Sequence, residues 1–425
     1  MTTEPTPFAK PSSNRNWYLL WVALVGVKLV LAHFHPEPAA SDEGTYMTVA
    51  RRLLDHGAYM RIDYMKPTAG IMPGYPLLVA AVLKLGGGSI APMYYINALL
   101  SLAIAWASGA LLFLMAGNRL LSRWCMVVVY LFPPIVTYAW HPLTEIPYTA
   151  ALMMMLYSWE KTRRRPLGVW NWFFLGLFTV VSFMIRPVMF LLTPLFFAWP
   201  LVVARLHWRA IAGAAVGTAV VLMLWLPWVY RNYKVFHGFV PLATTTGLAF
   251  FSGTLPDWSK WFEEQQAEMK RSGISDATHD ELAVSRHFAA AAQKNFERDK
   301  WGYYKRAIKN SWRLWPTAYS GRYFPKGTRQ YVAEGNWLAV ATKLTLGGMN
   351  LALLAGMACA VVILLGQPRW WPYILIIAYF HVMHAMIMPM PRYSMPLTPM
   401  IIVMIFGAAG HLWKRKMAAK EASAQ

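Results

Sequence analysis

Two adjacent carboxylates, Asp42 and Glu43, are the residues of this sequence best placed by type to do acid–base chemistry. One of two neighbouring carboxylates in apolar surroundings can take a proton from a hydroxyl as a general base. The same residues also fit a helix start, in which Ser41 caps the helix and the two acids favour its positive end. Both interpretations stay open, and they are compatible.

Cations that could bind an anion occur in two places. Four follow the acidic pair: Arg51, Arg52, Arg61 and Lys66. Three more stand beside the ends of apolar runs: Arg186, Arg231 and Arg392. Arginines that emerge at one membrane face can converge on a phosphate, and each can also reach lipid head groups on its own. We expect the three arginines to lie on the same side of the membrane.

His141 and Glu145 are four residues apart and could share one helical face. A carboxylate so close to an apolar run is costly unless it is paired or functional. We expect Glu145 to hydrogen-bond a polar substrate. A metal site would need more ligands than this turn offers, and His381 and His384 fit packing or hydrogen bonding better than metal binding.

The composition places these residues in a membrane protein. Of the 425 residues, 57% are apolar and 14% are charged, whereas soluble domains have about 45–50% and about 25%. The net charge is +21, but the basic residues stand in short clusters between apolar runs. That pattern indicates anionic lipid and membrane topology, and it argues against nucleic acid as a partner.

Ten apolar segments are long enough, at about 17–28 residues each, to be read as membrane spans. They lie at 17–33, 91–116, 124–140, 143–159, 168–185, 188–204, 210–230, 338–365, 370–388 and 394–412. With the N-terminus inside, every compact basic cluster falls on the cytoplasmic side. This topology requires 71–88 to be a short interfacial or re-entrant helix. An alternative for the first segment is a signal peptide.

The spans divide the chain into five parts. We expect a cytoplasmic tail at 1–16, an N-terminal membrane module at 17–230 whose first outer loop is 34–90, an outer segment at 231–337, further spans at 338–412, and a second tail at 413–425. In the outer segment, aromatic and apolar residues recur at three- and four-residue steps among lysines and arginines: Trp301, Tyr304, Ile308, Trp312 and Trp315. This predicts an interfacial amphipathic helix.

Five short regions resemble, in the same order, motifs of the polytopic GT-C glycosyltransferases, most closely the branch with protein O-mannosyltransferases and lipid A aminoarabinose transferases. They read DEGTY at 42–46, KP with PGYPLL at 66–78, LTEIP at 143–147, PWVYRN with GFVP at 227–241, and PRYSMP at 391–396. Three features depart from the family: an extra Ile146, Thr254 where Asn is usual, and an end directly after the last span.

The resemblance implies an all-α GT-C-like bundle of about ten transmembrane helices, with outer-face loops and interfacial helices. It also implies an inverting transfer of a sugar from a polyprenyl-phosphate carrier, such as undecaprenyl phosphate, to a hydroxyl of a glycan, lipid or protein. By position, Asp42 would be the general base, supported by Glu43 and Tyr46. Phosphate would be held by Lys66, Arg186, Arg231 and Arg392, and the sugar or acceptor would be contacted by Glu145.

The resemblance further implies a bacterial inner membrane location with the site facing the periplasm. Some family members use a divalent metal, and nothing in this sequence requires one. The main alternative function is a transporter or flippase for a lipid-linked or anionic substrate, and a structural partner in an envelope complex is a third. A transporter is expected to have internal repeats and polar residues in mid-span. The sequence has neither pattern.

Overall fold

The structure is a computed structural model, and it describes residues 14–34, 42–61, 65–274, 280–316 and 325–423. Within these ranges every regular element is a helix, and the only β contact is an isolated bridge between Met60 and Pro67. The predicted all-α class is therefore confirmed.

Each of the ten predicted spans contains one or more helices. Six helices of the described chain are long and apolar enough to cross a bilayer: α1 (Asn14–His33), α4 (Pro92–Ala116), α10 (Trp208–Phe236), α17 (Trp337–Leu364), α18 (Trp371–Ile387) with η4 (Pro368–Trp370), and α19 (Thr398–Ser423) with η5 (Pro391–Leu397). The other four segments are shorter, broken or more polar: α5 (Arg119–Leu131) with α6 (Pro133–Tyr138), α7 (Glu145–Arg164), α8 (Val169–Ile185), and η1 (Pro187–Leu192) with α9 (Thr193–Val203). The chain is a multi-pass helical membrane protein.

Helix α7 forms the centre of the bundle. It packs between α4 and α8, and α8 packs on α10 along most of its length. The last contact is close because Gly176 of α8 faces Gly217 of α10, where a Cβ on Gly176 would collide with the Gly217 carbonyl oxygen. Small residues allow membrane helices to approach in this way.

A buried lysine explains how the chain tolerates the break between α5 and α6. Pro133 and Pro134 have no N–H groups, so the carbonyl of Tyr130 loses its usual helical partner. The Nζ of Lys28 donates to this carbonyl at 3.2 Å and lies 4.0 Å from the Tyr130 ring centroid. Lys28 is 5% exposed, and its cost inside a membrane helix is offset by these contacts.

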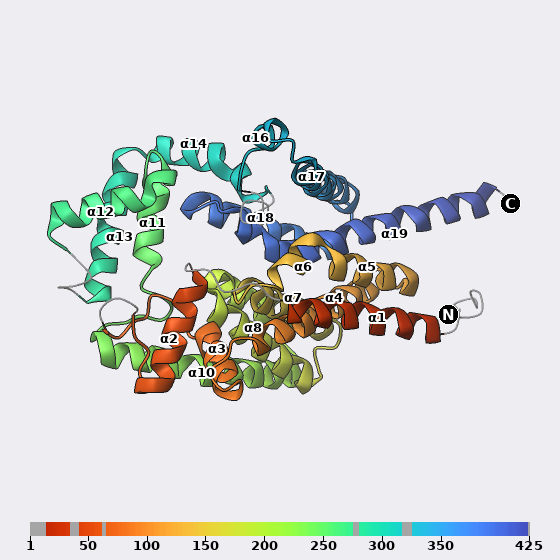
Figure 1. Cartoon of the computed structure of the whole chain (residues 1–425). Coiled ribbons are helices and arrows are strands. Elements are labelled where there is room, and N and C mark those ends of the chain that lie inside the picture. The colour runs from red at the N-terminus through yellow and green to blue at the C-terminus, as the bar shows by residue number, and fades with distance from the viewer. Residues whose placement is uncertain (1–13, 35–41, 62–64, 275–279, 317–324, 424–425) are drawn as a thin grey trace.

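The basic segments meet at the end of the bundle that carries both termini (Figure 1). The Arg123 guanidinium lies 5.4 Å from the Trp17 ring, and Lys414 Nζ donates to the carbonyl of Ala116 at 2.8 Å. Helices α7 and α18 are joined by a hydrogen bond from the hydroxyl of Tyr373 to Glu160 Oε2 at 3.4 Å.

The opposite end is built from short helices (Figure 1). They are α2 (Asp42–His56), α3 (Gly74–Leu85), α11 (Thr246–Thr254), η2 (Trp258–Lys260), α12 (Trp261–Ser272), α13 (Glu281–Arg298), α14 (Lys300–Asn310) and η3 (Ser311–Leu314), whereas α16 (Thr328–Ala333) lies apart from them beside α17. Helix α3, the predicted interfacial or re-entrant segment, is about 18 Å long, which is too short to span a bilayer of about 30 Å. It packs on α2 and so helps to place the acidic pair.

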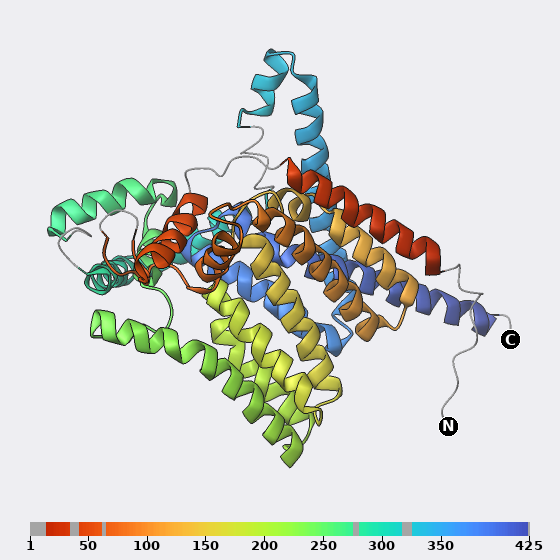
Figure 2. The same ribbon diagram turned by 60° about the horizontal axis from the view of Figure 1, so that its bottom comes forward.

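The predicted amphipathic face of 301–315 is exposed except at its end. Trp301 is 77% exposed and Ile308 75%, beside a row of basic side chains, as an interfacial helix requires. Trp315 departs from the prediction because its indole N–H donates to His381 Nδ1 at 3.1 Å, which turns the ring toward α18. In Figure 2, α16 and the start of α17, drawn in cyan and blue, project from the rest of the bundle.

Candidate active site

The first carboxylate of α2 pairs with the arginine of η5. Asp42 lies in the first turn of the helix, where the helix dipole favours a negative charge. Arg392 follows Pro391, which begins η5. Its Nη1 lies 2.5 Å from Asp42 Oδ2, with 29% and 44% of the respective side chains exposed. The Nε of Arg392 is buried and has no hydrogen-bond partner in the described part of the chain. An accessible base and an unsaturated cation therefore lie side by side.

Glu43 points to a different element from Asp42. Its Oε1 lies 3.2 Å from Nδ1 of His141, and the two side chains are 0% and 4% exposed. The turn that carries His141 is held by Asn97, whose Nδ2 donates to the His141 carbonyl at 3.0 Å. His141 and Glu145 do not share a helical face, as their spacing had allowed, because α7 begins only at Glu145. This buried pair anchors α2 to the bundle.

Glu145 and Arg186 form a second buried pair. Arg186 Nη2 donates to Glu145 Oε1 at 2.6 Å, and its Nε donates to Thr144 Oγ1 at 2.8 Å. The guanidinium also lies 5.8 and 5.5 Å from the ring centroids of Tyr148 and Tyr393. The second oxygen of Glu145, Oε2, is buried without a hydrogen-bond partner among the described residues. That oxygen is ready to accept a hydrogen bond from a ligand.

Tyr46 interacts electrostatically with both the Asp42–Arg392 pair and the Glu145–Arg186 pair. Its ring packs edge-on against the ring of Tyr75 in α3, with the two ring centroids 4.9 Å apart. Burial raises the pKa of Tyr46 to about 12; Arg186 and Arg392 oppose this shift, and the carboxylates of Asp42 and Glu145 add to it. The phenol is therefore a neutral hydrogen-bond donor at physiological pH.

Arg231 does not join this group, contrary to the expected convergence of three arginines. Its Nη1 donates to the carbonyl of Thr68 at 2.6 Å and its Nη2 to the carbonyl of Tyr59 at 2.9 Å. The guanidinium is also surrounded by aromatic rings, with Trp228 at 5.3 Å. Because both terminal nitrogens hold backbone carbonyls of the first loop, Arg231 positions that loop.

Lys66 lines a small cavity of about 110 Å³, and Arg392 is not part of its described lining. The neighbours of Lys66 there include Arg61, Asp280 and Glu281. Six of the eight predicted site residues lie together near the starts of α2 and α7: Asp42, Glu43, Tyr46, Glu145, Arg186 and Arg392. Lys66 and Arg231 belong to the neighbouring first-loop region.

Glu281 is a carboxylate that the sequence interpretation missed. It accepts three hydrogen bonds from two loops, from Thr68 Oγ1 at 2.5 Å, the N–H of Ala69 at 2.8 Å and Thr244 Oγ1 at 2.8 Å, and its Oε1 lies 3.9 Å from Arg61 Nη1 as an ion pair. The only local signal was an acidic Asp280–Glu281 pair at a helix start, where Asp280 caps α13. Glu281 ties α13 to the first loop.

The solvent exposure of the charged groups separates those that can bind a substrate from those that hold the structure in place. The Glu43–His141 and Glu145–Arg186 pairs are nearly closed to solvent, whereas Asp42 and Arg392 are open. Buried pairs hold geometry, and an accessible carboxylate beside an accessible guanidinium can exchange its partner for a substrate. The arrangement therefore offers a base, an anion-binding cation and a rigid support.

Comparison with known proteins gives similarities in structure but none in sequence. No family model and no curated protein matches the sequence. The structure is similar to the crystal structure of ArnT from Cupriavidus metallidurans bound to undecaprenyl phosphate, with a TM-score of 0.44 and 16% identity, covering 94% of this chain and 79% of that one. For apo ArnT from the same organism the TM-score is 0.41 and the identity 17%, covering 94% and 78%.

Proposed function

We propose that this protein is a membrane glycosyltransferase that moves a sugar from a polyprenyl-phosphate carrier to an acceptor hydroxyl. The observation that carries the proposal is the accessible Asp42–Arg392 pair at one end of a helical membrane bundle. It unites the two groups that such a transfer needs, a base for the acceptor and a cation for the phosphate. The five motif resemblances support the same reaction.

Arg392 receives the phosphate of the donor. A guanidinium can bind two phosphate oxygens at once, and Arg392 has an unused Nε in addition to the Nη1 that holds Asp42. The arriving phosphate competes with the carboxylate for Arg392. Donor binding then releases Asp42 from its ion pair, so that the base becomes free only when the donor is present.

Asp42 acts on the acceptor. Its carboxylate takes the proton of the acceptor hydroxyl while the hydroxyl oxygen bonds to the anomeric carbon of the sugar. The bond between that carbon and the phosphate oxygen breaks, and the phosphate leaves with the electron pair, its charge balanced by Arg392. Attack from the face opposite the phosphate inverts the anomeric centre.

The buried groups orient the sugar. Glu145 Oε2 is held in place by the bond between Arg186 and the other oxygen, and it can accept a sugar hydroxyl. Tyr46, neutral at physiological pH, can donate to the phosphate or the sugar. The positive-inside rule puts the basic end in the cytoplasm and this site on the outer face, which is the periplasmic face of a bacterial inner membrane.

The test is sugar transfer by purified protein in lipid nanodiscs, with a radiolabelled polyprenyl-phosphate sugar as donor. Asp42→Asn is expected to lower kcat by about 10²–10⁴-fold while donor affinity is kept or raised, because the base is lost and Arg392 is no longer held by a charge. Asp55→Asn is the matched control, since Asp55 is an exposed acid on the same helix. Normal turnover by Asp42→Asn would refute the assignment of the base.

A further inference from the structure

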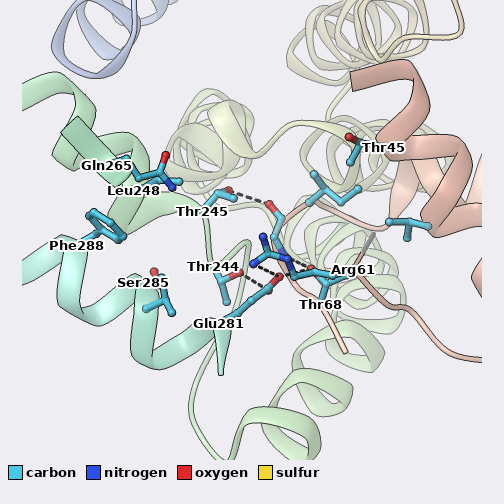
Figure 3. A pocket seen from close by; sticks show the side chains of 14 residues that line it. Thr45, Arg61, Thr68, Thr244, Thr245, Leu248, Gln265, Glu281, Ser285 and Phe288 are labelled. Carbon is cyan, nitrogen blue, oxygen red and sulfur yellow. Dashed lines mark hydrogen bonds and ion pairs between the residues drawn. The ribbon is translucent and has the colours of Figure 1, made fainter. Parts of the chain in front are cut away.

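A cavity of about 280 Å³ lies between α2, the rest of the first loop and the segments of α11, α12 and α13 (Figure 3). Its size is close to the lower limit of small-molecule sites, about 300 Å³. Five of its lining residues carry hydroxyl groups: Thr45, Thr68, Thr244, Thr245 and Ser285. We call this cavity the threonine pocket.

The threonine pocket has no excess of charge in its described lining. The charged side chains there are Arg61 and Glu281, which lie 3.9 Å apart and balance one another. A phosphate or carboxylate ligand would need a net positive lining. The described lining therefore favours a neutral ligand.

The hydrogen bonds of the pocket show which kind of neutral ligand it fits. The hydroxyls of Thr68 and Thr244 donate their protons to Glu281, and that of Thr245 donates to the carbonyl of Gly70 at 2.8 Å. Because each of these three hydroxyls has used its one proton, its oxygen can only accept a further hydrogen bond. Gln265 adds a buried Oε1 that has no partner among the described residues. A ligand for this lining must itself bring several O–H donors.

The pocket is continuous with the face of α2 that carries the base. Thr45 and Val49 line the pocket, and Asp42 is three and seven residues before them. Residues at these spacings lie on one side of a helix. Asp42 thus shares a face of α2 with two residues of the threonine pocket and is also paired with Arg392, as a base that serves both an acceptor and a donor requires.

We propose that the threonine pocket binds the acceptor, and that the acceptor is a neutral sugar ring of a glycan or glycolipid that presents one hydroxyl to Asp42. A sugar ring is uncharged and rich in O–H donors, which matches the balanced charge and the acceptor-rich lining. Gln265 Oε1 accepts from a sugar hydroxyl and fixes the ring. This inference rests on the proposed transferase function for the identity of the reaction.

The first experiment measures binding without turnover. Equilibrium binding of labelled methyl glycosides and short neutral oligosaccharides to the protein in nanodiscs is compared in three variants. Gln265→Leu is expected to weaken binding about three- to tenfold, as the loss of one hydrogen bond predicts, and Gln265→Glu, which keeps an acceptor oxygen, retains it. Gln266→Leu, at the exposed neighbouring residue, is the matched control. Equal binding by Gln265→Leu and the unaltered protein would overturn the proposal.

The second experiment measures transfer to a panel of acceptors. A neutral glycan is expected to accept the sugar, and Gln265→Leu raises its KM three- to tenfold with kcat and donor affinity unchanged. Transfer only to a serine peptide or to a phosphorylated lipid would overturn the neutral-sugar inference and leave the transferase function standing. If no donor is consumed with any acceptor, the transferase function fails, and the binding experiment still decides the fate of the pocket.

Discussion

Removal of Arg186 is expected to destabilise the protein more than removal of its partner Glu145. Glu145 is 0% exposed, and Arg186 supplies the N–H that reaches its Oε1 at 2.6 Å. Arg186→Met leaves a buried carboxylate without the cation that contacts it, which costs about 3–5 kcal/mol. Glu145→Gln costs less, because the guanidinium keeps Thr144 and the faces of two tyrosine rings.

The assay is reversible unfolding in mixed detergent micelles, with the free energy of unfolding measured for both single variants and for the double variant. The double variant Glu145→Gln/Arg186→Met is expected to regain part of the loss, because no charge stays buried. Arg271→Met is the control, since Arg271 is 67% exposed and pairs with Glu268 at the surface, where such pairs contribute about 0.2–1 kcal/mol. A cost for Arg186→Met within the control's range would refute the reasoning.

Three further changes test other parts of the account. Lys28→Met is expected to lower the free energy of unfolding by about 1–3 kcal/mol, because it leaves the Tyr130 carbonyl unpaired in the bundle; no change would contradict that role. Gly176→Leu is expected to cost at least about 1–3 kcal/mol by forcing α8 away from Gly217, and unchanged stability would show that the helices are not in close contact. Arg231→Gln is expected to speed amide hydrogen exchange at 65–70 about tenfold without lowering donor affinity, whereas weaker donor binding alone would restore a phosphate role for Arg231.

The membrane helices could be predicted because their signal is local. A run of apolar residues such as 91–116 marks its own helix, and α4 spans Pro92–Ala116. Breaks are local as well, since Pro133 and Pro134 divide the segment predicted at 124–140. The bundle contacts are not local, and nothing in the sequence places Lys28 against the carbonyl that these prolines leave free.

The site could be predicted only in part, because its residues meet across long stretches of chain. The motifs pointed to Asp42 and Arg392 separately, and only the structure joins them. The position of Arg231 at a helix end could not reveal that its donors face loop carbonyls. Glu281 was missed for the same reason: its partners are hydroxyls and an N–H of distant loops, which have no sequence signature.

A structure of the protein with a bound polyprenyl phosphate tests the central claim most directly. We expect the phosphate within hydrogen-bond distance of the Arg392 guanidinium, with Asp42 released from its present contact and facing the threonine pocket. A phosphate held at the basic end, for example by Arg123 or Lys414, with the Asp42–Arg392 pair undisturbed, would contradict the account.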